Sequence, residues 1–309
     1  MTVAVVDCGT NSTRLLIADD QGRTVVREMR ITRLGQGVDA TGTLAPEALA
    51  RNYACLSEYA ALMREHRVST ARLAATSAAR DASNGAQFLE EAQRITGATV
   101  ALLSGGQEAE LSYRGATSDL PPSDAPTMIV DIGGGSTELA ARVDGRLASH
   151  SMQIGCVRLS ERVIGSGILT NDALDRARIV VAEAIDGGLA EVPALRTLIG
   201  NVRLVGLAGT ISTLAQIDAG QATYERDAVH HRVLARADVA KWRAVLGAKT
   251  PPQRLEQPGM VKGREDVLVA GLIVLEGVMD RFEVNELLSS ESDILDGIVA
   301  EMLAGPVGA

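Results

Sequence analysis

The sequence is poor in aromatic residues, which make up 2% of its 309 positions. Proteins that stack the bases of single-stranded nucleic acids depend on such side chains, so this class is disfavoured. Positive charge is also scarce, because 30 Lys and Arg stand against 39 Asp and Glu and leave a net charge of −9. Without a dense basic tract, no nucleic acid polymer is expected as a partner. An anionic substrate would need a locally positive pocket or bound metal ions.

Cysteines are few and scattered, at Cys8, Cys55 and Cys156, with no spacing typical of a metal site. This pattern indicates a reduced, cytoplasmic protein, in which Cys8 is interpreted as a small filler. The longest apolar run, Val267 to Leu275, is too short to cross a bilayer, and the N-terminus reaches Asp7 without a basic leader. Neither a membrane nor a signal peptide is therefore expected. Hydrophobic residues are plentiful at 46%, enough for two ordinary domain cores.

The most informative stretch is Asp131-Ile-Gly-Gly-Gly-Ser-Thr-Glu138, which lies between two apolar runs of strand length. Three glycines that can adopt positive φ, followed by two hydroxyls, make a turn whose backbone N–H groups can close around a phosphate. Asp131 and Glu138 can flank the same pocket, where a divalent cation would offset the charge of ligand and protein. The stretch predicts a phosphate loop between two strands.

The same spacing occurs near the N-terminus in Asp7-Cys-Gly-Thr-Asn-Ser-Thr13, and the two aspartates are 131 − 7 = 124 positions apart. The Gly133–Gly135 stretch is not a P-loop, because no Gly-Lys-Ser/Thr follows, and strand-like alternation follows it where a dinucleotide fingerprint requires a helix. Each loop alone is explained equally well by a hairpin turn. The matched pair favours a duplicated α/β unit whose phosphate loops face one another across a cleft.

A proline-rich connector at residues 119–126 predicts a domain boundary. We expect a first lobe at residues 1–122, with a C-terminal helix within 293–309 as a candidate addition, and a second lobe at 123–292. A long helical stretch capped by Asn171 is expected to break near Gly187-Gly188.

Three further features follow predicted strands, and each has two explanations. Arg80 either holds a phosphate through its planar guanidinium or pairs with Asp81 or a helix end. Glu108 either compensates the dipole at a helix start or acts as a general base toward water. The small-residue loop with Gly209 and Thr210 either binds an anion at a helix N-terminus or is a simple strand-to-helix turn.

Two histidines and a group of basic residues complete the candidate features. His230-His231 lacks the further ligands at defined spacing that a metal site requires, so a structural or substrate-orienting role is favoured. Arg254, Lys262 and Arg264 belong to a region rich in proline and glycine and can supply positive charge near the cleft.

Six motifs together resemble the exopolyphosphatase/guanosine pentaphosphate phosphatase (Ppx/GppA) family of the acetate and sugar kinase, Hsp70 and actin superfamily. They occur in the family's order and cover nearly the whole chain. They are Val5-Val-Asp7-Cys-Gly-Thr-Asn-Ser-Thr13, Ala75-Thr-Ser-Ala-Ala-Arg80, Leu103-Ser-Gly-Gly-Gln-Glu108-Ala109, Asp131 to Glu138, Gly206-Leu-Ala-Gly-Thr210, and Ser290-Glu-Ser-Asp-Ile-Leu-Asp-Gly297.

The resemblance implies an α/β fold of two ribonuclease-H-like (actin-like ATPase) lobes with the active site in the cleft between them. It implies hydrolysis of a terminal phosphoanhydride, with Glu108 as the base that positions water and Arg80 as a second catalytic residue. It also implies Mg²⁺, with Mn²⁺ as an alternative, near Asp7, Asp131 and Glu138. The implied phosphate-binding residues are Asn11, Ser12, Thr13, Gly133, Gly134, Gly135, Ser136, Gly209 and Thr210. A homodimer is a further expectation at the family level.

The sequence departs from the family pattern in three respects. Gln107 stands where many relatives have a second Glu, and His231 stands where Gly is common. The chain ends after the two lobes, without the helical C-terminal domains of longer members, which favours short polyphosphate chains as substrates. We expect an exopolyphosphatase that releases terminal orthophosphate. The alternatives are a guanosine pentaphosphate (pppGpp) 5′-phosphohydrolase, a non-catalytic sensor of nucleotide or polyphosphate, or a sugar or acetate kinase.

Overall fold

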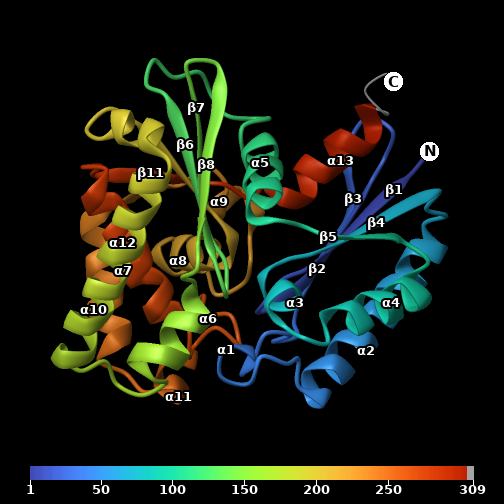
Figure 1. The fold of residues 1–309 in the computed structure, drawn as a ribbon, viewed down its shortest axis with the longest axis horizontal. Helices are drawn as coiled ribbons and strands as arrows, with labels where there is room; N and C mark the ends of the chain where they lie inside the picture. Colours follow the sequence, from blue (N-terminus) through green and yellow to red (C-terminus); the bar gives the residue numbers. More distant parts are fainter. Residues whose placement is uncertain (305–309) are drawn as a thin grey trace. The chain divides into compact units, whose positions relative to one another are not determined.

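The computed structural model describes residues 1–304, which form two compact units. One unit is Met1–Gly115 together with the C-terminal residues from Ile294 on, and the other is Ala116–Asp293 (Figure 1). The proline-rich connector had predicted a division between residues 122 and 123. Residues 305–309 of the expected C-terminal helix lie outside the described part of the chain.

The first unit contains a five-stranded sheet with the order β3-β2-β1-β4-β5. The strands β1, β2 and β3 form two antiparallel hairpins, whereas β1, β4 and β5 run parallel. The carboxyl ends of β1, β4 and β5 therefore lie at one edge of this sheet. The bounds are β1 (Val3–Cys8), β2 (Ser12–Ala18), β3 (Thr24–Ile31), β4 (Thr70–Ala75) and β5 (Thr99–Leu102).

Two cores cover the faces of this sheet, because alternate residues of a strand point to opposite sides. Ala4 and Val6 of β1 pack in one core with side chains of α2 and α4, whereas Val3 and Val5 pack in the other with side chains of α5 and α13. The helices are α1 (Val38–Thr41), α2 (Pro46–Glu65), α3 (Ser77–Asp81), α4 (Gly85–Thr96), α5 (Gly105–Ala116) and α13 (Ile294–Ala304).

The second unit contains a six-stranded sheet with the order β10-β11-β9-β6-β7-β8. Its strands β6, β9 and β11 run parallel, and antiparallel strands extend the sheet on both sides. The carboxyl ends of β6, β9 and β11 again share one edge. The bounds are β6 (Thr127–Ile132), β7 (Thr137–Val143), β8 (Arg146–Met152), β9 (Arg203–Leu207), β10 (Val233–Ala235) and β11 (Glu286–Ser289).

The longest helix of this unit continues through the glycine pair at which a break was expected. The helix α7 runs from Asn171 to Glu191, and its N-cap is Thr170, whose hydroxyl accepts from the backbone N–H of Ala173. A Cβ at Gly188 would lie 2.8 Å from the His150 ring, so the glycine allows close packing. The predicted break is wrong because tertiary packing outweighs the low helix propensity of glycine.

The remaining helices of the second unit are mostly short. They are α6 (Cys156–Leu159), η1 (Ser160–Ile164), η2 (Pro193–Leu198), α8 (Ala208–Asp218), α9 (Arg226–Val229), α10 (Arg236–Gly247), α11 (Pro251–Leu255) and α12 (Leu268–Arg281). Side chains of α7, α8, α10 and α12 share one large hydrophobic core with the sheet. Among residues 1–304, no helix is both long enough and apolar enough to cross a membrane.

Candidate active site

The two glycine-rich loops close with the same backbone hydrogen bond. The N–H of Gly9 donates to the carbonyl oxygen of Ser12 at 3.0 Å, and the N–H of Gly133 donates to that of Ser136 at 3.0 Å. A Cβ on either glycine would lie 3.1 Å from the same acceptor, tighter than most contacts allow. The repeat seen in the sequence is therefore also a repeat of turn geometry.

The two hairpins differ in the residue that faces the aspartate. Asp7 is opposite Arg14, and its Oδ2 accepts from Arg14 Nε at 3.0 Å and Nη2 at 2.7 Å. Asp131 is opposite Glu138 in the pairing of β6 with β7. Directly opposite residues of antiparallel strands project to the same face, with Cβ atoms about 4.5–5.5 Å apart. The first loop thus holds an ion pair, and the second holds two neighbouring carboxylates.

The carboxylate pair of the second unit is buried. Asp131 is 7% exposed and Glu138 is fully buried. Ser151 lies opposite Glu138 on β8 and donates its hydroxyl to Glu138 Oε1 at 2.6 Å. Two like charges held this close away from water are costly unless a cation compensates them. Carboxylate oxygens are also the donors that Mg²⁺ prefers, so this pair fits a divalent cation.

The segment before α6 fixes the shape of the Gly133–Gly135 loop. The backbone N–H groups of Cys156 and Val157 donate to the carbonyl oxygens of Gly133 and Gly134, both at 2.9 Å. A Cβ at Gly155 would lie 2.5 Å from the carbonyl of Gly134, so a larger residue would displace the loop. The loop is therefore held in place by a neighbouring chain segment as well as by its own turn.

The third small-residue loop lies beside the second at the same sheet edge. Leu207 at the end of β9 is the parallel neighbour of Asp131, and α8 begins directly after it. A Cβ at Gly209 would lie 1.8 Å from Arg264 Nη2, which shows that the buried guanidinium rests on this glycine. A guanidinium at a helix N-terminus favours an anion, and Thr210 lies in the first turn of the same helix.

The basic residues of the 249–264 region have different roles. Arg254 is only 1% exposed and donates to the backbone carbonyl oxygens of Leu246, Glu265 and Gly167 at 2.7–2.8 Å. Its guanidinium thus joins three segments of the second unit, and the predicted supply of positive charge near the cleft stays a prediction. Arg264, in contrast, lies against the Gly209 loop as described above.

The two predicted catalytic residues of the first unit lie together. Arg80 is in α3, directly after β4, and Glu108 is in the first turn of α5, after β5. Arg80 Nη1 donates to the carbonyl oxygen of Leu103 at 2.7 Å and lies 3.5 Å from Glu108 Oε2. This ion pair presents Glu108 as a carboxylate, the form that a general base requires. The structure therefore joins two residues that the sequence could only treat separately.

Gln107 caps the helix that carries Glu108. The Oε1 of Gln107 accepts from the backbone N–H of Ser104 at 2.9 Å, and the Ser104 hydroxyl accepts from the N–H of Gln107 at 3.3 Å. This reciprocal pair is a capping box. Helix-start chemistry is therefore supplied by Ser104 and Gln107, which leaves Glu108 available for another role.

Two buried donors at this edge have no protein acceptor. Within residues 1–304, Asn11 Nδ2 and Arg80 Nη2 are buried and lack a hydrogen-bond partner. Asn11 follows β1 and Arg80 follows β4, and these strands are parallel neighbours. Buried donors are almost always paired in proteins, so both atoms suit an anionic ligand.

Thr13 differs from its neighbours in the first loop. Its hydroxyl lies 2.8 Å from that of Thr32 and 2.8 Å from Asn52 Oδ1, and its carbonyl accepts from Tyr59. Thr13 is fully buried, and this network occupies its hydroxyl inside the core. Its predicted contact with phosphate stays a prediction.

Sequence reasoning missed two residues of the site region, Arg14 and Ser151. Arg14 follows Asp7 by the same seven positions that separate Glu138 from Asp131, so aligning the two repeats would have found it. Ser151 carries no local signal, because it reaches Glu138 only through the pairing of β7 with β8. Cys8 is buried, and desolvation and then Asp7 raise the pKa of its thiol, in agreement with a filler role.

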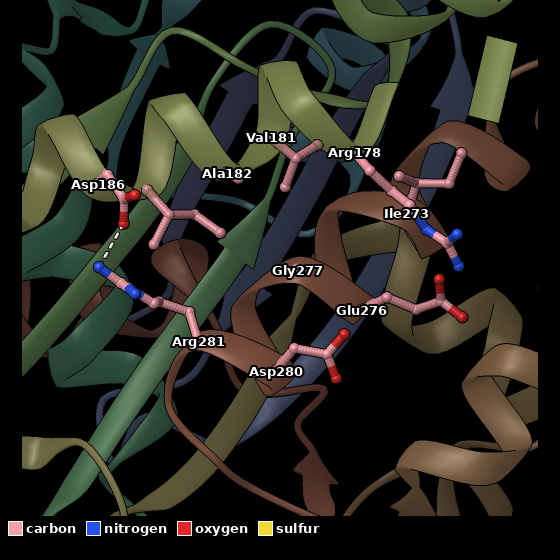
Figure 2. Close-up of a pocket in the computed structure, with 10 residues that line it drawn as sticks. Arg178, Val181, Ala182, Asp186, Ile273, Glu276, Gly277, Asp280 and Arg281 are labelled. Carbon is pink, nitrogen blue, oxygen red and sulfur yellow. Dashed lines mark ion pairs between the residues drawn. The ribbon is translucent and has the colours of Figure 1, made fainter. Parts of the chain in front are cut away.

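The pocket in Figure 2 lies between α7 and α12 and contains none of the predicted site residues. Its apolar lining includes Val181 and Ile273, and the pair of Arg281 with Asp186 links the two helices (Figure 2). A Cβ at Gly277 would lie 2.4 Å from Val181, so this glycine permits the close helix contact. We interpret the pocket as a feature of helix packing.

Comparison with known proteins gives a consistent result. The model of the Ppx/GppA phosphatase family matches residues 15–305. Exopolyphosphatase 2 of Mycobacterium tuberculosis is 42% identical to this chain, and the alignment covers 98% of each.

Solved structures with the same fold also cover the chain. An exopolyphosphatase-like protein is 34% identical, with a TM-score of 0.90 and coverage of 98% of this chain and 99% of the other. An exopolyphosphatase from Cytophaga hutchinsonii is 28% identical, with a TM-score of 0.88 and full coverage of both chains. These matches and the two sheets confirm the predicted α/β class with two lobes.

Proposed function

The chain belongs to the Ppx/GppA phosphatase family, and we propose that it is an exopolyphosphatase that uses Glu108 as its general base and Mg²⁺ as its cofactor. The family predicted from the motifs is confirmed. The full-length likeness to exopolyphosphatase 2 supports hydrolase activity on polyphosphate. The proposed product is orthophosphate from the end of the chain.

One observation supports this function most directly, namely the pair of buried donors without acceptors. Asn11 Nδ2 and Arg80 Nη2 follow neighbouring parallel strands, and Arg80 lies 3.5 Å from Glu108. A terminal phosphate supplies the acceptor oxygens that both donors lack. Glu108 would then lie beside Arg80, a residue that would bind the phosphate.

The chemistry follows from these assignments. Glu108 accepts a proton from water as the water oxygen attacks the terminal phosphorus. The bond from this phosphorus to the bridging oxygen breaks, and the shortened polyphosphate leaves with the electron pair. Phosphoryl transfer depends mainly on positioning and on charge stabilisation, which the guanidinium of Arg80 supplies.

The proposed metal ligands are not equivalent. Asp131 and Glu138 form a buried carboxylate pair whose oxygens suit a divalent cation, whereas Asp7 forms an ion pair with the guanidinium of Arg14. We therefore assign the Mg²⁺ to Asp131 and Glu138. The ion would neutralise phosphate charge when it is bound.

The test is orthophosphate release with Mg²⁺ from short and long polyphosphates and from guanosine pentaphosphate. We expect release from polyphosphate, fastest with short chains, and a loss of about 10²–10⁴-fold in Glu108→Gln. Glu110→Gln is the matched control, because Glu110 is on the same helix but 59% exposed and paired with Arg114.

Three results would contradict the proposal. Near-normal turnover in Glu108→Gln would exclude Glu108 as the base. A preference of the unaltered chain for guanosine pentaphosphate would instead establish the nucleotide phosphohydrolase. Binding of polyphosphate without any release would indicate a sensor.

A further inference from the structure

Asp119, His230 and His231 form a cluster that the proposed reaction does not use. Asp119 belongs to the connector after α5, and the two histidines lie between α9 and β10. One ligand atom from each residue lies within 4.8 Å of the other two. All three residues belong to the second unit.

The distances in this cluster match those of a metal site. Asp119 Oδ2 is 3.1 Å from His230 Nε2, and Asp119 Oδ1 is 3.6 Å from His231 Nε2. The two rings stack with centroids 3.7 Å apart, so both Nε2 atoms approach the same carboxylate. Two ligands bound tetrahedrally to Zn²⁺ at about 2.0–2.2 Å lie roughly 3.3–3.6 Å apart, close to both of these distances.

The position of His231 has two unusual features. Its φ is +59°, a left-handed conformation that is uncommon for residues other than glycine. Its Nε2 is buried and has no hydrogen-bond partner within residues 1–304. The backbone N–H of His231 donates to the carbonyl oxygen of Ser289 at 2.8 Å, which holds this conformation. Strained backbone of this kind is frequent where a side chain binds a ligand.

The hydrogen bonds of His230 determine its tautomer. The backbone N–H of Glu291 donates to His230 Nδ1 at 3.0 Å, so Nδ1 has no proton. In the neutral ring the proton is then on Nε2, which donates to Asp119 Oδ2 at 3.1 Å. The same Oδ2 accepts from the hydroxyl of Ser292 at 2.7 Å.

We propose that Asp119, His230 and His231 bind a divalent transition metal such as Zn²⁺, with water completing the coordination, and that binding changes the tautomer of His230. Coordination requires the lone pair of Nε2, so the ring proton moves from Nε2 to Nδ1 with no net proton release. Nδ1–H then faces the N–H of Glu291, and two donors cannot bond to each other. Metal binding therefore breaks the hydrogen bond between His230 and Glu291.

This site differs in chemistry from the carboxylate pair assigned to Mg²⁺. Imidazole nitrogens favour zinc, nickel or copper, whereas carboxylate oxygens suit magnesium. The broken bond belongs to the segment between β11 and α13, close to the point at which the chain passes from the second unit to the first. Zinc would thus alter a segment at a unit boundary while magnesium remains bound elsewhere.

The test is calorimetric titration of the full chain with Zn²⁺ in excess Mg²⁺, which occupies sites made of oxygen ligands. We expect one zinc per chain, and binding at least about tenfold weaker in Asp119→Asn and in His231→Gly. Glycine suits the positive φ at position 231, and asparagine keeps an acceptor for Ser292, so both variants should fold. His66→Asn is the control and should bind zinc normally.

A second measurement tests the tautomer change. Hydrogen exchange at the Glu291 amide should become faster when zinc binds, because its acceptor is lost. If the unaltered chain does not bind zinc, or if all variants bind it equally well, the proposed site is refuted. Zinc binding with unchanged or slower exchange at Glu291 would refute the tautomer change.

Discussion

Glu138→Gln separates the two contributions that the carboxylate pair makes to stability. The substitution removes one of two buried charges but leaves an amide oxygen that can accept the hydrogen bond from Ser151. Without metal, the variant should be more stable than the unaltered chain, because the repulsion from Asp131 is relieved. With saturating Mg²⁺ the order should reverse, because the variant has lost a metal ligand.

The size of the effect can be estimated from the strand pairing. Residues directly opposite on antiparallel strands have Cβ atoms about 5 Å apart. Two unit charges at this distance repel by about 3 kcal/mol at an effective dielectric constant of about 20. Mg²⁺ at a thousand times its dissociation constant stabilises the unaltered chain by about 4.1 kcal/mol, which exceeds this repulsion and reverses the order. For a unit of this size each kcal/mol shifts the melting temperature by about 2–4 °C.

The assay is thermal unfolding in EDTA and in Mg²⁺, followed for both proteins. Glu183→Gln serves as the control, because Glu183 is exposed on α7 of the same unit and should respond like the unaltered chain. Lower stability of Glu138→Gln in EDTA would contradict the prediction, since other groups would then compensate the charge of the two carboxylates. Equal stabilisation of the variant and the unaltered chain by Mg²⁺ would also contradict it.

Two further predictions concern buried groups of the first unit. Thr13→Val should lower the free energy of unfolding by about 1–3 kcal/mol in urea titrations and leave KM unchanged, because the hydroxyl bonds to Thr32 and Asn52; a raised KM at unchanged stability would instead support phosphate contact. Burial raises the pKa of Cys55 to about 11. The protonated thiol therefore contributes its full share to the free energy of unfolding below about pH 8.5, where the thiol of the unfolded chain is also protonated. This contribution is lost as the pH rises toward 11. Cys55→Ala should therefore reduce the fall in unfolding free energy between pH 9 and 10.5 by up to about 1.4 kcal/mol per pH unit, and an unchanged slope would contradict the assignment.

The fold was predictable where local chemistry and tertiary structure agree. The repeated Asp-x-Gly-x-x-Ser-Thr spacing specifies a tight turn between strands, and both turns form with the same hydrogen bond from Gly9 and from Gly133. The break expected at Gly187-Gly188 shows the opposite case. There the helix continues through Gly188, because this position packs against the ring of His150 and has no room for a larger side chain. His150 is distant in the sequence, so the local pattern could not reveal this contact.

Charge was harder to assign, because its role depends on neighbours that the local sequence does not contain. Arg254 and Arg264 are similar in sequence context, yet one binds backbone carbonyl groups in the interior and the other lies on Gly209. Asp7 and Asp131 likewise have the same local motif and opposite partners. Strand register decides between an ion pair and a carboxylate pair, and register is a property of the whole sheet.

The histidine pair shows the same limit for metal sites. In the sequence, His230 and His231 lacked further ligands at regular spacing, which argued against metal binding. The third ligand, Asp119, is 111 positions away from His230, and only the fold brings it within 3.1 Å. The backbone of His231 has φ +59°, a conformation that is uncommon for residues other than glycine, and this distinguishes the loop from an ordinary turn. If zinc binds there, metal coordination explains why a histidine occupies a position whose backbone conformation favours glycine. His231→Gly should then abolish zinc binding and relieve the backbone strain.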